Sequence, residues 1–474
     1  MAATGEWDYI IVGGGLAGCV VVHRLKQYKP CSRILVLEAG PDVSGNKEIL
    51  QFSTLNFIGG QFDWAYKTVP QAHLDGRQIH VPAGKALGGG SVINACGWIR
   101  GSAADFDSWA EAVQDERWSY KGQLQYFKMT EKWYNNENAE FYGHDGKLQI
   151  ESPISTGRIY PLATIAEQSW AEAGVRKLPG NDINTGNNTD TLVRSVKLVG
   201  SQAVGVYLDD DTETLGKEVI IAAGAYRTPQ VVMISGIGPK ETLDKYGIEV
   251  KVENPEVGNN YNDHVMMQLN WKLKDPSKGY ALGSANPYSP NPKRLGGDGK
   301  PDIVPWNAPI DDRWHAHKHH HDGMKPTSRG TITIESKDPK VAPLLDPNFF
   351  ATEVDKAVWR HSLRKITALM TGNTALGRDV VSGETPFPGF EPMSVDSSDE
   401  YLDSRVKAQG MSTLHGCGTC SMGKVVDADL QVKGVQNLRV VDASVIPISI
   451  GAHIQAAVYA LAEQAAVIIS GRKN

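Results

Sequence analysis

The chain has 474 residues, of which 41% are hydrophobic and 22% charged, so it contains ample material for a core and exceeds the usual size of one domain. We therefore expect two substructures that share an interface. The formal net charge is -6, without an acidic or basic block, which disfavours nucleic acid as a partner.

The amino-terminal residues predict a strand, a glycine turn, a helix and a second strand. DYIIV (8–12) is the first strand, GGGLAG (13–18) is the turn, the helix extends to about Lys26, and RILVLEAG (33–40) is the next strand. Strands joined in this way form a parallel pair with a right-handed crossover. No basic segment or cleavage site precedes the first strand, so we expect no secretory signal and an intracellular, cytoplasmic location.

Gly13, Gly15 and Gly18 form a GxGxxG pattern at the predicted turn, and Glu38 follows Gly18 by 20 residues, at the end of the next strand. The first glycine allows a tight turn, the second lets backbone approach a pyrophosphate, and the third permits close packing of strand and helix. An acidic residue at this offset can accept hydrogen bonds from ribose hydroxyls and disfavours NADP. The pattern predicts a dinucleotide site but does not distinguish FAD from NAD.

Two later segments repeat the strand–turn–helix pattern. Residues 217–239 predict a strand, a glycine turn and a helix that ends at Gly236, and NLRVVDAS (437–444) predicts a strand before a long carboxyl-terminal helix. We expect the three separated α/β pieces to form one nucleotide-binding layer. The apolar stretch Ile454–Ile469 contains glutamine and glutamate, so it predicts a buried amphipathic helix and not a membrane span.

The intervening segments differ in character. Residues 282–301 are rich in Pro, Gly and Asn and predict a loop, whereas TITIES (331–336) alternates and predicts a strand of a sheet. The aromatic stretches FDWAY (62–66) and DFDSWAEAV (105–113) indicate a second domain packed on the first.

The cysteines and a histidine cluster raise the question of a metal. The five cysteines, an odd and small number, fit free buried thiols in a reducing compartment; they are Cys19, Cys31, Cys96, Cys417 and Cys420. The last two form a CxxC that lacks a second pair for zinc, so we interpret it as structural packing. A second cluster contains His315, His317, His319, His320 and His321, and a metal site is one hypothesis for it. We favour the interpretation as a solvated loop near a cavity mouth and predict no metal.

Five motifs, in order, identify a family. They are GKALGGGSVINACGWIRG (84–101), GAYRTPQVVMISGIG (224–238), HGCGTCSMG (415–423), VVDADLQVKGVQNLRVVDASVIP (425–447) and GAHIQAAVYALAEQAA (451–466). Together with the GxGxxG turn they resemble the glucose–methanol–choline (GMC) oxidoreductases over almost the whole chain. The resemblance implies an α/β fold with a Rossmann-type FAD-binding domain and a sheet-based substrate-binding domain. It also implies an FAD-dependent enzyme that removes a hydride from the CH–OH group of a small organic alcohol.

The resemblance also implies domains and cofactor contacts. The expected domains are FAD-binding (1–50, 190–258 and 420–474), flavin-covering (51–104) and substrate-binding (105–189 and 259–419). The residues expected to hold FAD are Gly13, Gly15, Leu16, Ala17, Gly18, Glu38, Ala39, Gly84, Gly88, Gly89, Ser91, Asn94, Ala95, Val196, Ala223, Asp442, Ala443, His453 and Ile454. Val196 corresponds to a residue beside the adenine. Some members carry a histidine in the 84–101 loop that tethers the flavin; none is present here, so we expect dissociable, non-covalent FAD.

His415 and His453 fall on the two catalytic positions of the family. We expect His415, in a loop, to be the base and His453, just before the last helix, to bind the same oxygen. Removing the hydroxyl proton makes an alcohol a strong hydride donor, and neutral imidazole suits this task near neutral pH. The alternative is that both histidines only satisfy hydrogen bonds in the core. Asp263 and His264, in NNYNDHV, are interpreted as structural support.

The chain departs from the family in two short regions, after DINTGNN (182–188) and from Val265 to Pro326. Both normally help to wall the substrate cavity, so the identity of the substrate is left undetermined. The electron acceptor (oxygen or another) and the oligomeric state (monomer or homodimer) are left undetermined as well. Two interpretations stay open: the segments are true deletions, or residues of the protein are missing from this sequence. A lyase or decarboxylase on the same fold is the runner-up function, and a non-catalytic FAD-binding protein is a third.

Overall fold

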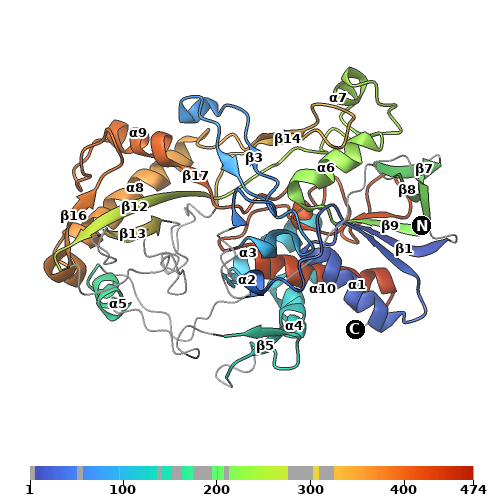
Figure 1. Cartoon of the computed structure of the whole chain (residues 1–474), viewed down its shortest axis with the longest axis horizontal. Coiled ribbons are helices and arrows are strands. Elements are labelled where there is room, and N and C mark those ends of the chain that lie inside the picture. Colours follow the sequence, from blue (N-terminus) through green and yellow to red (C-terminus); the bar gives the residue numbers. More distant parts are fainter. Residues whose placement is uncertain are drawn as a thin grey trace.

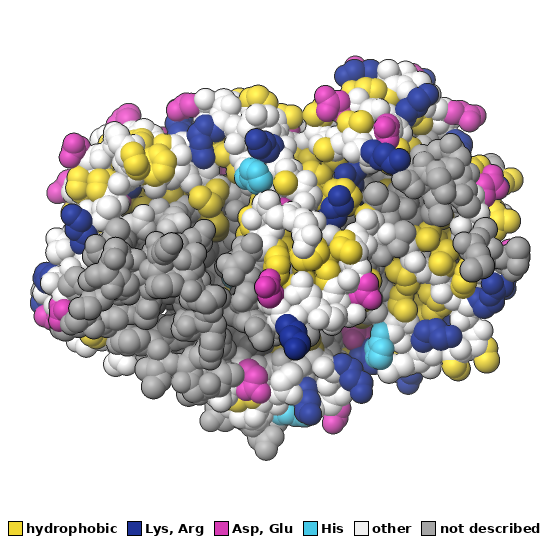
Figure 2. All heavy atoms as spheres, in the orientation of Figure 1, with side chains coloured by type: hydrophobic (Ala, Val, Ile, Leu, Met, Phe, Trp, Pro, Cys, Tyr) yellow, Lys and Arg dark blue, Asp and Glu magenta, His cyan; other side chains and the backbone are white. Residues whose placement is uncertain are grey.

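The computed structural model describes residues 6–50, 57–94, 97–135, 141–151, 155, 163–173, 195–199, 201–207, 213–275, 303–308 and 325–472. Two sheets lie toward opposite ends of the long axis of the molecule (Figure 1). On the face drawn in Figure 2, Lys and Arg side chains are interspersed with Asp and Glu side chains, so the described part of this face carries no large patch of one sign.

The first sheet joins the three predicted α/β pieces. Its strand order is β2 (Ile34–Leu37), β1 (Trp7–Val12), β9 (Glu213–Ile221), β8 (Gln202–Tyr207) and β7 (Ser195–Val199), and β18 (Leu438–Val440) also pairs with β9. Strands β2, β1, β9 and β18 are parallel, whereas β8 and β7 form an antiparallel extension. The prediction of a single layer assembled from distant segments is therefore confirmed.

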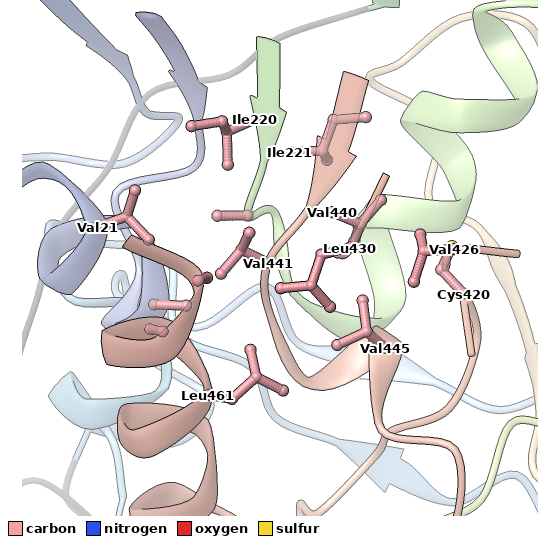
Figure 3. Packing of buried hydrophobic residues seen from close by; sticks show 14 of the residues in the cluster. Val21, Ile220, Ile221, Cys420, Val426, Leu430, Val440, Val441, Val445 and Leu461 are labelled. Atoms are coloured by element: carbon pink, nitrogen blue, oxygen red, sulfur yellow. The ribbon is translucent and has the colours of Figure 1, made fainter. Parts of the chain in front are cut away.

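Two helices far apart in the sequence pack together beside this sheet (Figure 1). Helix α1 (Leu16–Tyr28) follows β1, and α10 (Gln455–Ser470) is the carboxyl-terminal helix. Val21 of α1, Leu461 of α10 and Ile220 of β9 belong to the same main hydrophobic core (Figure 3), and the side chain of Arg24 forms an ion pair with Glu463 at 2.5 Å. Burial of these apolar side chains is the main force that holds the layers together.

Helix α10 is buried on nearly all sides, so the prediction of a buried helix is right but its polar residues do not form a solvent-facing stripe. Glu463 and Gln464 are both buried, and Gln464 accepts a hydrogen bond from the side chain of Gln123 on α4 (Tyr120–Thr130). Among the described residues, no helix has the length and apolar character needed to cross a membrane.

The second sheet is antiparallel. It contains β13 (Ile303–Ala308), β12 (Val265–Leu273) and β16 (Val381–Thr385), and β17 (Met411–Ser412) pairs with the start of β12. Side chains alternate along β12, and its buried face packs with α8 (Glu353–Thr371) and α9 (Asp399–Gln409) in a separate hydrophobic cluster. The two sheets thus lie in the two largest of four hydrophobic clusters among the described residues, and the domain boundaries given above stay a prediction.

The remaining elements connect the two sheets. The other helices are α2 (Lys47–Leu50), α3 (Ala103–Val113), α5 (Ala163–Glu172), α6 (Gly224–Ile234) and α7 (Lys240–Lys245), with a π-helical turn, η8 (Leu376–Val380), and short 3₁₀ turns η2 (Ala72–Leu74), η3 (Gly89–Val92), η4 (Glu116–Trp118) and η9 (Ala443–Val445). The short strand pairs are β3 (Tyr66–Lys67) with β4 (His80–Val81), β5 (Glu131–Trp133) with β6 (Leu148–Ile150), β10 (Ile237–Gly238) with β11 (Val252–Glu253), and β14 (Thr331–Thr333) with β15 (Leu344–Asp346). The strand predicted at 331–336 thus ends at Thr333, because β15 offers only three partners.

The cysteine prediction is partly wrong. Cys417 and Cys420 are buried free thiols in the main core, and Cys420 lies among valines and Leu430 (Figure 3), which confirms structural packing. Cys31 is exposed and Cys19 is half-buried, so these two are not core thiols. Cys96, the 282–301 loop and the histidine cluster at 315–321 lie outside the described residues.

Candidate functional site

The glycine turn after β1 is a close approach of backbone segments. Gly13 has φ +99°, and a Cβ there would lie 2.4 Å from the carbonyl oxygen of Ala222 at the end of β9. A Cβ on Gly18 would lie 2.1 Å from the oxygen of Gly13. Side chains at either position would force the strands and α1 apart, which is the role that the sequence pattern predicts.

Helix α1 presents its amino terminus to this turn. Leu16 is its first residue, Ala17 is buried, and the N-cap residue, Gly15, has no side chain to cap the helix. The first N–H groups of a helix have no partner within it, and the helix dipole favours an anion at that end. A Cβ on Gly15 would find its nearest neighbour 4.0 Å away, so the space above the turn is open to a ligand.

Glu38 lies at the end of β2 and holds the turn. One carboxylate oxygen accepts a hydrogen bond from Gly14 N–H at 3.1 Å, and the other accepts from Gly40 N–H at 2.9 Å. Ala39 lies in the chain between Glu38 and Gly40, so the second of these hydrogen bonds spans it. Each carboxylate oxygen has a second lone pair, so Glu38 retains the capacity to accept from a ribose hydroxyl.

The glycine-rich loop that begins at Gly84 lies against the same turn. Gly88 forms a bridge with Gly15, a Cβ on Gly89 would lie 3.1 Å from the Cα of Gly15, and the hydroxyl of Ser91 donates to the oxygen of Gly88 at 2.8 Å. A Cβ on Gly84 would lie 1.9 Å from the oxygen of Gly89, so the loop is folded tightly on itself. The structure thus brings two sequence-distant glycine segments together.

The loop also reaches the last helix. The side chain of Asn94 donates to the amide oxygen of Gln455 at 3.0 Å, one residue beyond Ile454, the N-cap of α10. Ala95 lies outside the described residues.

Asp442 is a buried carboxylate between β18 and η9. It accepts hydrogen bonds from Gly224 N–H at 3.0 Å, the hydroxyl of Thr228 at 2.6 Å and Ser444 N–H at 2.8 Å. Burial raises the pKa of Asp442. The carboxylate therefore ties α6, whose N-cap is Ala223, to the turn that begins at Ala443.

Val196 lies on β7, at the edge of the six-stranded sheet. Its N–H donates to the hydroxyl of Ser235, just beyond the end of α6, at 2.7 Å. This contact places Val196 on the α6 side of the sheet.

The two histidines predicted to be catalytic lie side by side. Nε2 of His415 and Nδ1 of His453 are 2.9 Å apart, and the two rings are nearly perpendicular, at 85°. His415 belongs to a loop and is buried, whereas His453 is half-buried and comes just before α10, as the sequence predicted. A glycine makes room for His453, because a Cβ on Gly97 would lie 3.2 Å from its Cδ2.

A third histidine, which the sequence reading treated only as structural support, completes the row. Nδ1 of His264 lies 2.8 Å from Nδ1 of His415, and its Nε2 lies 2.8 Å from the hydroxyl oxygen of Ser449. His264 is fully buried. The Asp263–His264 pair in NNYNDHV was the available signal, but the partner of His264 lies 151 residues away and no spacing rule connects them.

Asp263 supports the loop that carries His415. Its carboxylate accepts hydrogen bonds from His415 N–H at 2.9 Å and from the hydroxyl of Ser412. This observation agrees with the interpretation of Asp263 as structural support.

The electrostatics favour a neutral base. Burial lowers the pKa of His415 well below its ordinary value of 6.5, and His453 and His264 lower it further. Burial also raises the pKa of Asp263 to about 7, so this carboxyl supplies little negative charge below neutral pH. A neutral imidazole held between two others can accept a proton from a hydroxyl group placed at its unprotonated nitrogen.

The buried thiols of the CxxC segment are poor nucleophiles. Burial raises the pKa of Cys417 to about 12, so its thiolate is not available as a nucleophile, and its Sγ donates to the side-chain oxygen of Asn262 at 3.2 Å.

Comparison with known proteins gives one consistent family. Family models described as GMC oxidoreductase match residues 7–190, 166–266 and 326–462. The chain is 34% identical to a GMC-type oxidoreductase, acuG, of Aspergillus aculeatus, over 97% of this chain and 98% of the relative. It is 31% identical to an oxygen-dependent choline dehydrogenase of Staphylococcus aureus, over 99% and 94%. Among solved structures, pyridoxine 4-oxidase from Mesorbium loti superposes with a TM-score of 0.81 at 26% identity, covering 99% of this chain and 100% of that one.

The alignment with the Aspergillus aculeatus relative extends over 538 positions, more than the 474 residues of this chain. It therefore includes positions at which this chain has no residue. This agrees with the shorter length noted in the sequence.

Proposed function

Because the chain belongs to the GMC oxidoreductase family, an FAD-dependent family of enzymes that act on alcohols, we propose a specific assignment of roles. His415 removes the hydroxyl proton of a small organic alcohol, and His453 binds the same oxygen. FAD is bound non-covalently, and oxygen or another acceptor reoxidises it.

One observation carries this proposal: the facing nitrogens of His415 and His453, 2.9 Å apart. A substrate hydroxyl takes the place of their mutual hydrogen bond. Its O–H donates to Nε2 of His415 while its oxygen accepts from Nδ1–H of His453. The hydroxyl proton then moves to His415, whose lowered pKa keeps it neutral and ready to accept. The role of a mere core hydrogen-bond pair does not explain why His453 stays half-buried.

The residues around the glycine turn fit FAD. The uncapped amino terminus of α1 and the open space at Gly15 suit its diphosphate, Glu38 suits a ribose, and the loop from Gly84 to Asn94 covers the turn. We assign the same role to the other cofactor residues named from the sequence. When bound, FAD accepts the hydride that leaves the alcohol carbon.

We predict non-covalent binding because residues 84–101 contain no histidine at which the flavin could be tethered as in some family members. Acid precipitation of the purified protein tests it. We expect the flavin to stay in the supernatant, and a coloured pellet would contradict the proposal.

The substrate class proposed is a primary alcohol of low molecular weight. Two of the three relatives named above are a choline dehydrogenase and a pyridoxine 4-oxidase, which makes choline and pyridoxine the first compounds to test. Neither name supports the lyase or decarboxylase alternative. The free thiols, including exposed Cys31, fit a reducing compartment and thus a role in intracellular metabolism or biosynthetic tailoring.

The experiment is anaerobic mixing of the FAD-loaded protein with a panel of primary alcohols, while the flavin absorbance is followed and the product analysed. We expect one group of alcohols to bleach the flavin and yield one equivalent of aldehyde. Turnover of a substrate with no bleaching at any stage would contradict alcohol oxidation, and so would a flavin that no alcohol reduces.

A further inference from the structure

The three histidines form a continuous hydrogen-bonded row. It runs from His453 through His415 to His264 and ends at the hydroxyl of Ser449, with nitrogen–nitrogen distances of 2.9 and 2.8 Å and a final distance of 2.8 Å. Both ring nitrogens of His415 are therefore engaged, one on the side of His453 and the other on the buried side. The proposed function uses only the first contact.

The number of protons available in this row means that its hydrogen bonds must share one direction. A neutral imidazole has one N–H and one lone pair, so a row of neutral rings has all its hydrogen bonds pointing the same way. If His415 is to accept a proton at Nε2, its N–H is on Nδ1 and donates to Nδ1 of His264. The N–H of His264 is then on Nε2 and donates to the hydroxyl oxygen of Ser449. The same direction lets His453 donate from Nδ1, as binding of the substrate oxygen requires.

The protein holds His264 rigidly in this position. The residue is fully buried immediately before β12, and its oxygen accepts a hydrogen bond from Thr413 N–H at 2.9 Å. On the facing loop, Leu414 has φ +66°, a left-handed conformation that is strained for leucine, and its N–H donates to the hydroxyl of Ser412 at 2.9 Å. The loop thus bends sharply just before His415, which brings that ring against His264.

We propose that His264 is a positioning residue for the reaction: it accepts the Nδ1–H of His415, which leaves the lone pair on Nε2 facing the substrate, and it supports the imidazolium that forms when His415 takes the proton. The inference rests on the proposed function, because it assigns His264 a role only if His415 is the base. Without His264, the buried Nδ1–H would lose its acceptor, and the tautomer with the proton on Nε2, which still has His453 as a partner, would be favoured. That tautomer cannot accept the hydroxyl proton.

Two variants of similar shape separate hydrogen bonding from packing. In His264→Asn the side-chain oxygen takes the place of Nδ1 and still accepts from His415, whereas His264→Leu has nearly the shape of asparagine and no acceptor. His361→Leu, on the exposed side of α8, is the control for a histidine replaced elsewhere. Ser449→Ala removes only the distant end of the row.

The first readout is the tautomer of His415, measured on FAD-loaded protein without alcohol by long-range ¹H–¹⁵N correlation of ¹⁵N-histidine, with the signal identified by its loss in His415→Ala. We expect the Nδ1–H form in the wild type, His361→Leu and His264→Asn, and the Nε2–H form in His264→Leu. This measurement does not depend on any substrate, so it tests the positioning role even if the proposed alcohol oxidation fails.

The second readout is the rate constant of anaerobic flavin reduction. We expect His264→Leu to lower it about 10- to 100-fold, the range seen when a partner that orients a functional histidine is removed, with a smaller loss in Ser449→Ala. His264→Asn should recover most of the rate, with little change in KM, because His415 keeps its Nδ1–H form and His453 still donates to the substrate oxygen. Equal rates and tautomers in His264→Leu and His264→Asn, whether both impaired or both normal, would overturn the proposal.

Discussion

Gly97→Ala places a methyl group beside His453 and leaves the imidazole itself unchanged. The added Cβ would lie 3.2 Å from Cδ2, 3.4 Å from Nε2 and 3.5 Å from Cγ of the ring. Carbon atoms prefer separations of about 3.5–4.0 Å, so the ring has to move by roughly 0.3–0.8 Å. The hydrogen bond from His453 to His415 measures 2.9 Å and tolerates little displacement.

We therefore expect Gly97→Ala to lower kcat by about 10- to 100-fold, because a misplacement near 1 Å can cost about 100-fold in rate. FAD affinity and the free energy of unfolding should change little. The assay is steady-state kinetics with the alcohol found in the panel, together with FAD titration by fluorescence. Gly45→Ala is the control, because a Cβ there meets nothing within 4 Å. A Gly97→Ala enzyme with wild-type kcat would refute the view that the position of His453 matters.

Three further predictions concern the cofactor turn and the buried charges. Gly13→Ala adds a positive-φ strain and a contact of 2.4 Å with Ala222, so it should destabilise the protein by about 2–6 kcal/mol and weaken FAD binding in a calorimetric titration; unchanged affinity would contradict the turn's role. Asp263 has its pKa raised from 3.8 to about 7, so the stability that its protonated form contributes is present below pH 3.8 and lost as pH rises through 7. Urea unfolding should show the wild type losing up to about 4 kcal/mol relative to Asp263→Asn between about pH 4 and 7, and parallel curves would disprove it. Arg405→Met leaves Glu384 charged, unpaired and about 1% exposed, which should cost about 3–5 kcal/mol in the same assay; a loss below about 1 kcal/mol would show that the pair is dispensable.

Much of the cofactor-binding layer could be predicted because its signals are local. The spacing of Gly13, Gly15 and Gly18 between a strand and a helix specifies close backbone contacts, and the structure places them there. The prediction for Glu38 was incomplete. Its carboxylate accepts hydrogen bonds from two backbone N–H groups and so holds the turn, which a spacing rule for ribose binding does not include.

The histidine site was predictable only in part. The motifs around His415 and His453 led to the pair, since each motif is contiguous in the sequence. His264 was missed as a partner because its contact depends on how the start of β12 packs against a loop 151 residues away. The space that Gly97 leaves for His453 is equally non-local. Side-chain contacts set by tertiary packing leave no periodic trace in a sequence.

The most direct test of the account is single-turnover flavin reduction by the alcohol substrate in the wild type, His415→Ala and His453→Ala, across pH and without oxygen. We predict a loss of about 100- to 10,000-fold in His415→Ala at equal FAD content, and a wild-type rate that falls only as pH drops through a pKa below 6.5, where His415 becomes protonated. A His415→Ala enzyme that reduces its flavin at the wild-type rate, with the wild-type pH profile, would contradict the assignment of His415 as the base.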